Sequence, residues 1–141
     1  MKIDYTKNMG NISTEMLTGG FFVGWPNPPS PEMHLRILQS AWCSYVAIDC
    51  ATGAVVGFIN CISDGVLSAY VPLLEVLPAY QGQGIGKELV RLMLDETKDL
   101  YMIDIAHDED KTGFYAQFKP HTGILSYFRN YHSQAGKLYV N

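Results

Sequence analysis

Residues 76–90, VLPAYQGQGIGKELV, constrain the fold of this chain more than any other segment. Glycine occupies positions 82, 84 and 86, between a run of strand-forming residues and a run of helix-forming residues. Glycine lacks the Cβ atom that keeps a ligand away from the backbone, so the N–H groups here can point at an anion. The pattern predicts a strand, a tight turn and a helix, with an anion-binding site at the N-terminus of the helix.

Two common phosphate-binding loops do not match this segment. A P-loop requires glycine five residues before its Gly-Lys pair and a serine or threonine after it, but Gln81 and Glu88 stand at these positions. A dinucleotide-binding loop requires its third glycine where Lys87 stands. The anion site is therefore predicted to belong to another class.

The residues after the glycines predict a helix followed by a strand. The helix has apolar residues at i, i+4, i+7 and i+8, the spacing of one buried face: Ile85, Leu89, Leu92 and Met93. Residues 100–106, LYMIDIA, are expected to form a buried strand in which Asp104 is an unusual charge. A strand, a helix and a second strand in this order indicate a locally parallel sheet.

The rest of the chain predicts further strands and helices. Ser30, Pro31 and Glu32 are typical of a helix start, and the apolar stripe of that helix is expected at Leu35, Leu38 and Trp42. Two β-rich runs, 43–50 and 54–63, predict a hairpin that turns at Gly53. A third run, 66–77, contains Pro72, which indicates a bulge or a frayed edge. Residues 111–118 are expected to form a short helix and 123–131 a last strand.

Length and composition limit the class of protein. A chain of 141 residues has the size of one domain, so residues 1–141 are predicted to form a single domain. The chain is 48% hydrophobic and 17% charged, as in a globular protein, and no apolar run approaches the roughly 20 residues of a membrane span. The first residues lack the apolar core of a secretory signal. A net charge of −4 has the wrong sign for nucleic-acid binding, so we expect a soluble protein with small partners.

The cysteines and histidines give no sign of a disulfide framework or a metal site. Three cysteines, Cys43, Cys50 and Cys61, form neither a close pair in the sequence nor an even number, which favours reduced thiols and a cytoplasmic location. The four histidines lack the short paired spacing that places two imidazoles on one metal, so ordinary surface or hydrogen-bonded histidines are expected.

The glycine segment resembles the acetyl-CoA signature of the GNAT N-acetyltransferases, with Gln81, Gly84 and Gly86 at the matching positions. The resemblance extends from about Ala54 to Tyr131. It implies an α/β (α+β) fold with a central mixed, mostly antiparallel sheet that is flanked by helices and splayed at the acetyl-CoA site. It also implies acetyl-CoA as cosubstrate, no metal, and a possible homodimer. The residues expected to bind acetyl-CoA are Val76, Gln81, Gly82, Gln83, Gly84, Ile85, Gly86 and Lys87.

The resemblance further implies that an amine attacks the thioester directly. The backbone N–H of Val76 is the expected partner of the developing oxyanion. Tyr115 matches the family tyrosine near the sulfur, and it is better suited to donate a hydrogen bond to the thiolate than to protonate it. An alkylamine is protonated at neutral pH, so a base or a water relay must take its proton. Glu75 is the candidate base and Asp104 the rival.

The sequence leaves the acceptor open. Phe21, Phe22 and Trp25 could wall an apolar acceptor pocket or belong to the core. The chain departs from many relatives at Asp108 and Lys111 and at Lys119-Pro120. We expect acetylation of a primary amine on a small molecule; the alternatives are a coenzyme-binding regulatory module without turnover and an acetyltransferase for protein termini or lysines.

Overall fold

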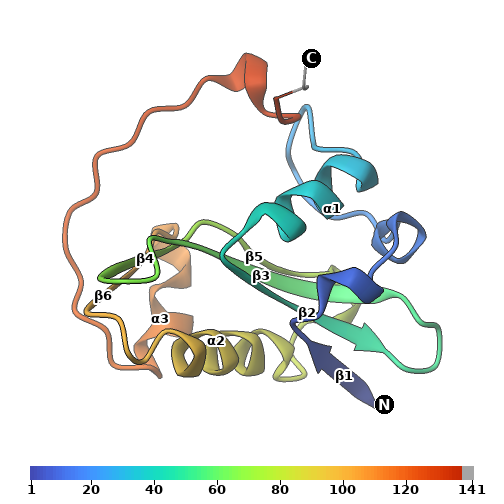
Figure 1. The fold of residues 1–141 in the computed structure, drawn as a ribbon, viewed down its shortest axis with the longest axis horizontal. Coiled ribbons are helices and arrows are strands. Elements are labelled where there is room, and N and C mark those ends of the chain that lie inside the picture. The colour runs from blue at the N-terminus through green and yellow to red at the C-terminus, as the bar shows by residue number, and fades with distance from the viewer. Residues whose placement is uncertain (138–141) are drawn as a thin grey trace.

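The computed structural model describes residues 1–137 and contains a six-stranded sheet with helices on both faces (Figure 1). The strands are β1 (Ile3–Thr6), β2 (Cys43–Asp49), β3 (Val55–Ser63), β4 (Ser68–Val71), β5 (Leu74–Val76) and β6 (Met102–Ile105). The α-helices are α1 (Pro31–Ser40), α2 (Ile85–Glu96) and α3 (Thr112–Ala116). Short 3-10 turns span Met9–Asn11, Thr14–Leu17, Pro78–Tyr80, Glu109–Lys111 and Tyr131–Ser133.

The sheet is mixed and mostly antiparallel, as predicted. Its strand order is β1-β2-β3-β4-β6, with β5 also paired to β3. The predicted hairpin is β2–β3, and Gly53 supplies the positive φ of its turn (74°). The predicted parallel contact is also present, because β6 runs parallel to β4 with Ala69 opposite Ile103.

Pro72 divides the third β-rich run into two strands, which confirms the predicted interruption. Both β4 and β5 pair with β3, at different parts of its length. The next strand, β6, pairs with β4 and not with β5. The outer edge of β5 therefore has no strand beside it within residues 1–137, and the sheet opens between β5 and β6.

Helix α1 begins at the predicted cap but ends before Trp42. The Ser30 hydroxyl accepts a hydrogen bond from the Met33 N–H at 3.1 Å, and Pro31 occupies the first turn. Leu38 is buried, whereas Trp42 lies beyond the helix and is 44% exposed. The prediction that Trp42 belongs to the helical stripe is wrong, because the chain has already turned into an extended conformation at Ala41.

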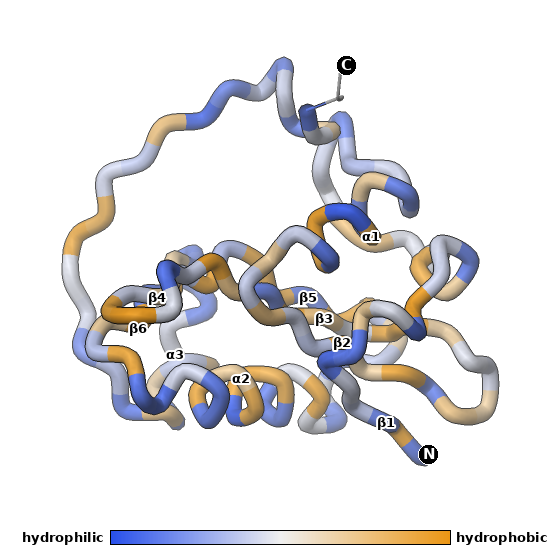
Figure 2. Tube along the Cα trace, viewed as in Figure 1, coloured by the Kyte–Doolittle hydropathy of each residue, from blue (hydrophilic) through white to orange (hydrophobic). Residues whose placement is uncertain are grey.

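Helix α2 packs its apolar face on the sheet, as its periodicity predicted (Figure 2). The fully buried positions are Ile85, Leu89, Val90 and Met93, and Leu92 is half-buried. A Cβ atom on Gly57 of β3 would lie 3.3 Å from side-chain atoms of Ile85 and Leu89. The glycine thus permits the close approach of α2 to the centre of the sheet.

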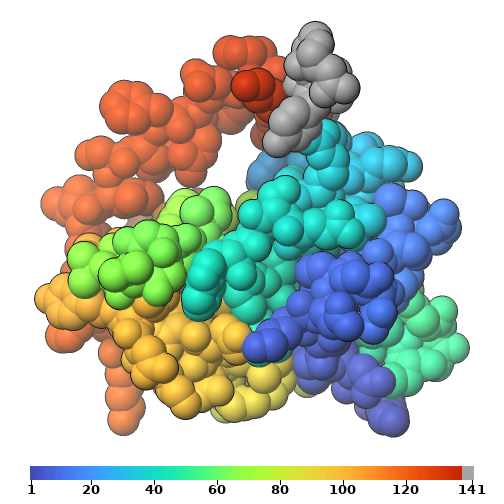
Figure 3. Space-filling view, viewed as in Figure 1, coloured from blue at the N-terminus to red at the C-terminus, as the bar shows by residue number. Residues whose placement is uncertain are grey.

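Two predictions for the C-terminal part are wrong. Strand β6 is an edge strand with exposed Met102 and Asp104, not a buried strand, because it has a neighbour on one side only. Residues 123–130 form no strand, and an open gap separates this segment from the body of the molecule (Figure 3). No strand of residues 1–137 runs beside it to complete a ladder.

The structure also brings together two cysteines that are distant in sequence. Cys43 of β2 lies directly opposite Cys61 of β3, although both thiols are free. Burial raises the pKa of the Cys43 thiol to about 11, so this thiol is protonated and unreactive at neutral pH. Within residues 1–137, no helix has both the length and the apolar character that crossing a bilayer requires.

Candidate active site

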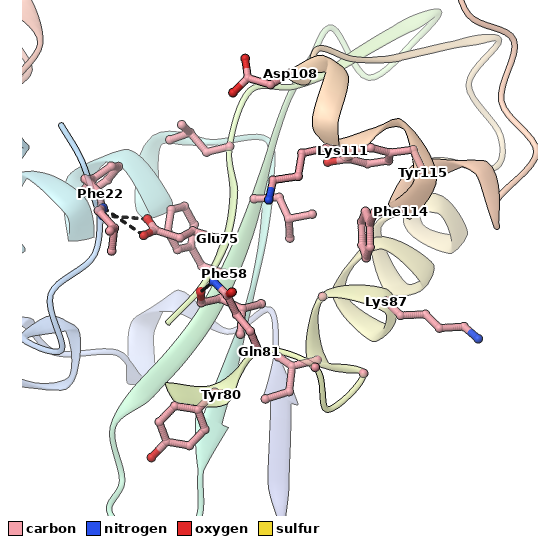
Figure 4. Close-up of a pocket in the computed structure, with 18 of the residues that line it drawn as sticks. Phe22, Phe58, Glu75, Tyr80, Gln81, Lys87, Asp108, Lys111, Phe114 and Tyr115 are labelled. Carbon is pink, nitrogen blue, oxygen red and sulfur yellow. Dashed lines mark hydrogen bonds between the residues drawn. The ribbon is translucent and has the colours of Figure 1, made fainter. Parts of the chain in front are cut away.

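A cavity of about 730 Å³ opens where β5 and β6 diverge (Figure 4). One wall is β5 together with the glycine turn. A second wall is the 3-10 turn Glu109–Lys111 together with helix α3, and the third is the loop that precedes α1. Its lining includes Phe22, Val23, Trp25, Phe58, Leu73, Leu74, Glu75, Val76, Tyr80, Gln81, Gly82, Gly84, Ile85, Gly86, Lys87, Asp108, Lys111, Phe114, Tyr115 and Gln117.

The glycine turn forms one side of the cavity. Gly82 and Gly84 have φ values of 77° and 83°, which side chains rarely tolerate, and open space surrounds the positions of their missing Cβ atoms. Gly84 is the N-cap of α2, so the N–H groups of the first helical turn have no intrahelical partner. The turn therefore offers several backbone donors and the positive end of a twelve-residue helix to an anion.

Side chains around the glycines have different positions. The Gln81 Nε2 donates to the Val76 carbonyl at 2.9 Å, which ties the turn to the end of β5. Lys87 points away from the centre of the cavity (Figure 4). Gln83 is exposed and is the one predicted coenzyme contact that does not line the cavity.

The backbone N–H of Val76 faces the open side of β5. The bonds from Leu77 N to Val56 O (2.9 Å) and from Asn60 N to Leu73 O (3.2 Å) identify the hydrogen-bonded pairs of the β3–β5 ladder. Val76, opposite Gly57, falls between these pairs. In an antiparallel ladder the N–H of such a residue points away from the partner strand. Because no strand lies beside β5 on that side, this donor is available to a ligand in the cavity.

Glu75 connects β5 to the loop before α1. Its Oε1 accepts a hydrogen bond from the Phe22 N–H at 2.7 Å and its Oε2 accepts one from the Val23 N–H at 3.2 Å (Figure 4). Phe22 has a positive φ of 63°, an uncommon conformation for a residue with a bulky side chain. The carboxylate thus holds a strained loop against the cavity, and two of its roughly four lone-pair sites remain free.

Tyr115 of α3 lies across the cavity from the glycine turn. Its ring stacks on His107 with a centroid distance of 4.5 Å and is 8% exposed. Burial raises the pKa of the phenol above its ordinary value. The hydroxyl is therefore protonated at neutral pH and can donate a hydrogen bond.

The remaining candidates divide between the cavity and the surface. Asp104 is exposed on β6 and does not line the cavity, so the expectation that it faces a cleft is wrong. Asp108 and Lys111, two departures from the family pattern, both line the cavity, and Lys111 extends into it (Figure 4). Phe22 and Trp25 line it as well, whereas Phe21 belongs to the core.

Sequence reasoning missed Phe58 and Phe114. Phe58 lies on β3 directly opposite Glu75, and only the register of the two strands reveals that it reaches the cavity. Phe114 precedes Tyr115 in α3, and its ring lies 3.5 Å from the position that a Cβ atom on Gly86 would occupy. A glycine next to an aromatic residue on another element leaves no sequence signal, because the two are 28 residues apart in the numbering of the chain.

His34 also differs from expectation. It is neither on the surface nor hydrogen-bonded through Nε2, since it is 1% exposed and this atom has no partner within residues 1–137. Phe21, Phe22 and Phe58 surround the imidazole, with ring centroids 4.3 to 5.1 Å away. Burial lowers its pKa to about 4, so the ring is neutral at physiological pH. No group of three or more metal-ligating side chains occurs in the described part of the chain.

The comparisons with known proteins agree with this geometry. The model of the acetyltransferase (GNAT) family matches residues 13–119. A candidate acetyltransferase from Deinococcus radiodurans R1 is 40% identical, with a TM-score of 0.91 over 96% of this chain and 93% of its own. A GNAT-family acetyltransferase from Streptococcus pneumoniae TIGR4 is 32% identical, with a TM-score of 0.71 over 92% of this chain and 100% of its own.

One more distant structure shares the fold alone. Glucosamine-6-phosphate N-acetyltransferase from Arabidopsis thaliana is 12% identical, with a TM-score of 0.68 over 92% of this chain and 99% of its own. The comparison with curated proteins found no match.

Proposed function

The chain belongs to the GNAT family of acetyl-CoA-dependent acetyltransferases, and from that premise we propose that it acetylates a primary amine on a small molecule by direct attack. We also propose that residues 1–141 act as one such domain. The observation that carries the proposal is that the open Val76 N–H and the glycine turn face the same cavity.

The residues of the cavity fit acetyl-CoA. Its pyrophosphate suits the unpaired N–H groups and the helix dipole at Gly84, where no Cβ atom blocks the approach. We assign the coenzyme contacts to Val76 and to residues 81–87. When bound, acetyl-CoA supplies an activated acyl thioester.

Three groups of this chain promote the transfer in the proposed mechanism. The Val76 N–H donates to the oxygen of the thioester carbonyl as negative charge develops on it. Glu75 accepts a proton from the incoming ammonium group, directly or through water, with a lone pair that Phe22 and Val23 do not use. The protonated Tyr115 hydroxyl donates a hydrogen bond to the departing thiolate.

The acceptor pocket is assigned to the loop that Glu75 holds. Phe22, Val23 and Trp25 give this side of the cavity an apolar wall, and the carboxylate gives it a negative charge. An apolar wall beside one carboxylate suits an amine with an apolar body. Three free thiols, including exposed Cys50, support a reducing compartment such as the cytoplasm.

Release of free thiol from acetyl-CoA in the presence of a panel of amines and peptides tests this function. We expect small primary amines to accelerate thiol release and peptides to leave it near the background rate. Acceleration by peptides alone would replace the small-molecule acceptor with a protein. If neither class accelerates thiol release although acetyl-CoA binds, the proposed acceptor class is wrong.

A further inference from the structure

Lys111 is a cation that faces the cavity without a partner of its own. Its side chain extends from the start of α3 into the cavity, toward the side on which Glu75 lies (Figure 4). None of the ion pairs within residues 1–137 involves Lys111, and its ammonium group has no hydrogen-bond partner there. Lysine usually extends its charge into bulk water, whereas this side chain is directed inward. An anionic group of a bound molecule would give the ammonium group a partner.

The backbone at the start of α3 places Lys111 in the cavity wall. The Lys111 N–H donates to the Asp108 carbonyl at 3.0 Å, which closes the 3-10 turn before the helix. Lys111 then precedes Phe114 and Tyr115 by three and four positions, the spacing of neighbours on one helical face. All three side chains line the cavity. The cavity face of α3 therefore carries one positive charge beside the tyrosine that we assign to the leaving thiolate.

The other charged residues of the cavity leave Lys111 and Glu75 as the two charges that face a bound molecule. Lys87 and Asp108 also line the cavity, but both side chains are directed away from its centre (Figure 4). Glu75 keeps two lone-pair sites beyond its hydrogen bonds to the loop before α1. A molecule in the cavity therefore meets one negative group from β5 and one positive group from the start of α3.

We propose that the acceptor is an amino acid, an amine that also carries a carboxylate, and that Lys111 binds this carboxylate. The inference rests on the proposed acetylation of a small amine and names the class of that amine. Glu75 receives the ammonium group, and Lys111 receives the carboxylate. The apolar wall formed by Phe22, Val23 and Trp25 receives the rest of the molecule. The carboxylate takes no part in the bonds that form or break, so Lys111 determines specificity.

The charge of the site favours a carboxylate over a phosphate group on the acceptor. A phosphate monoester carries a charge of roughly −1.5 to −2 at neutral pH. Lys111 supplies a single positive charge, and Glu75 adds a negative charge to the same cavity. A molecule with one ammonium group and one carboxylate is neutral overall, as is this pair of side chains. The amino acid therefore leaves no unbalanced charge in the cavity.

Pairs of acceptors that differ only in the carboxylate test the assignment. Phenylalanine and phenethylamine share an amine and an aromatic body, and γ-aminobutyrate and propylamine share an amine and an alkyl chain. In thiol-release assays with acetyl-CoA, we expect the amino acid of at least one pair to have a KM about 5- to 30-fold lower than its decarboxylated partner. This range lies between an exposed and a desolvated charged contact. Equal KM values, or lower values for the decarboxylated amines in both pairs, would overturn the proposal.

Variants of Lys111 connect the preference to this side chain. Lys111→Met removes the charge and is expected to erase the preference by raising the KM of the amino acid alone, whereas Lys111→Arg is expected to retain it. The control Lys98→Met removes the same charge at an exposed position outside the cavity and is expected to keep the KM ratio of the parent. If Lys111→Met weakens both members of a pair equally, or weakens coenzyme A binding in calorimetry, Lys111 serves the coenzyme or the fold and the proposal is wrong.

Binding measured without turnover separates this inference from the proposed function. Trp25 lines the cavity, so with Trp42→Phe as background its fluorescence reports acceptor binding. In protein saturated with desacetyl coenzyme A, we expect the amino acid of the preferred pair to bind more tightly than its partner, and Lys111→Met to remove the difference. Equal binding would overturn the acceptor class even if amines accelerate thiol release. Tighter binding of the amino acid without thiol release would support the carboxylate site and contradict the proposed transfer.

Discussion

The substitution Glu75→Gln separates the observed role of this side chain, which is to hold the loop before α1, from its proposed role as a base. In the parent protein, two charge-assisted hydrogen bonds of 2.7 and 3.2 Å hold Phe22 and Val23. The variant amide keeps one acceptor oxygen, while its NH₂ group faces a backbone donor. Exchange of charged for neutral hydrogen bonding costs about 1–2 kcal/mol, which corresponds to a factor of roughly 5–30 in the equilibrium between the held and the released loop. The KM for the amine is expected to rise by up to that factor.

The loss of the proposed base is expected to have a separate effect on turnover. Positioned acid–base groups typically contribute about 10²–10⁴ in rate, so kcat of the variant is expected to fall by at least about a hundredfold at neutral pH. Alkylamines lose their proton near pH 10.4, so the gap between variant and parent is expected to narrow as the pH rises. Thiol release measured as a function of amine concentration at each pH gives both kcat and KM.

The exposed Glu32→Gln provides the matched control, since it removes the same charge outside the cavity. It is expected to keep the kcat and KM of the parent. If Glu75→Gln raises KM but leaves kcat and its pH profile unchanged, Glu75 only positions the loop and the base must be sought elsewhere.

Three further substitutions test other parts of the site. Tyr115→Phe removes a hydroxyl whose pKa is raised by burial. The variant is expected to have a kcat about 10- to 150-fold lower, with little change in melting temperature. The control Tyr127→Phe, at an exposed position, is expected to leave kcat and melting temperature unchanged. Gly86→Ala adds a methyl group 3.5 Å from Phe114, which is an ordinary contact. The affinity for acetyl-CoA, measured by calorimetry, is expected to weaken at least tenfold, while the stability of the helix rises by up to about 1 kcal/mol. Unchanged affinity would remove Gly86 from the coenzyme site. The pKa of buried His34 is about 4 in the folded chain and near 6.5 in the unfolded chain. As the pH drops, the unfolded chain therefore binds the proton at a higher pH than the folded chain, and the free energy of unfolding decreases. Urea unfolding is expected to show a loss of about 2 kcal/mol between pH 7 and pH 5 that is absent in His34→Gln, and an equal loss in the variant would assign it to other groups.

The features that the sequence predicted well are local. The Ser30 cap is complete within four residues, because its hydroxyl accepts from the Met33 N–H. The turn before α2 requires glycine at positions 82 and 84 because both have positive φ. Such features depend on neighbouring residues alone, so composition and spacing suffice to place them.

The features that the sequence left open depend on contacts between distant residues. Glu75 was expected beside Val76, but its hydrogen bonds to Phe22 and Val23 cross more than 50 positions of the chain. The register that brings Cys43 opposite Cys61 has no signal in the spacing of the cysteines. A register follows from the hydrophobic pattern and turn geometry of the whole sheet.

The predicted last strand shows a different limit. Residues 123–131 have the composition of a strand, yet the described chain gives them no partner. Strand propensity reflects packing against neighbouring strands, so it cannot say whether the neighbour belongs to the same chain.

Isothermal titration of the folded protein with acetyl-CoA, and with coenzyme A that lacks the acetyl group, tests the central claim most directly. The backbone donors at the start of α2 are proposed to hold the pyrophosphate that both ligands share. We predict saturable binding of both, with one ligand per chain, and weaker binding of both to Gly86→Ala. A protein that is folded by circular dichroism and gives no heat of binding with either ligand would contradict the account.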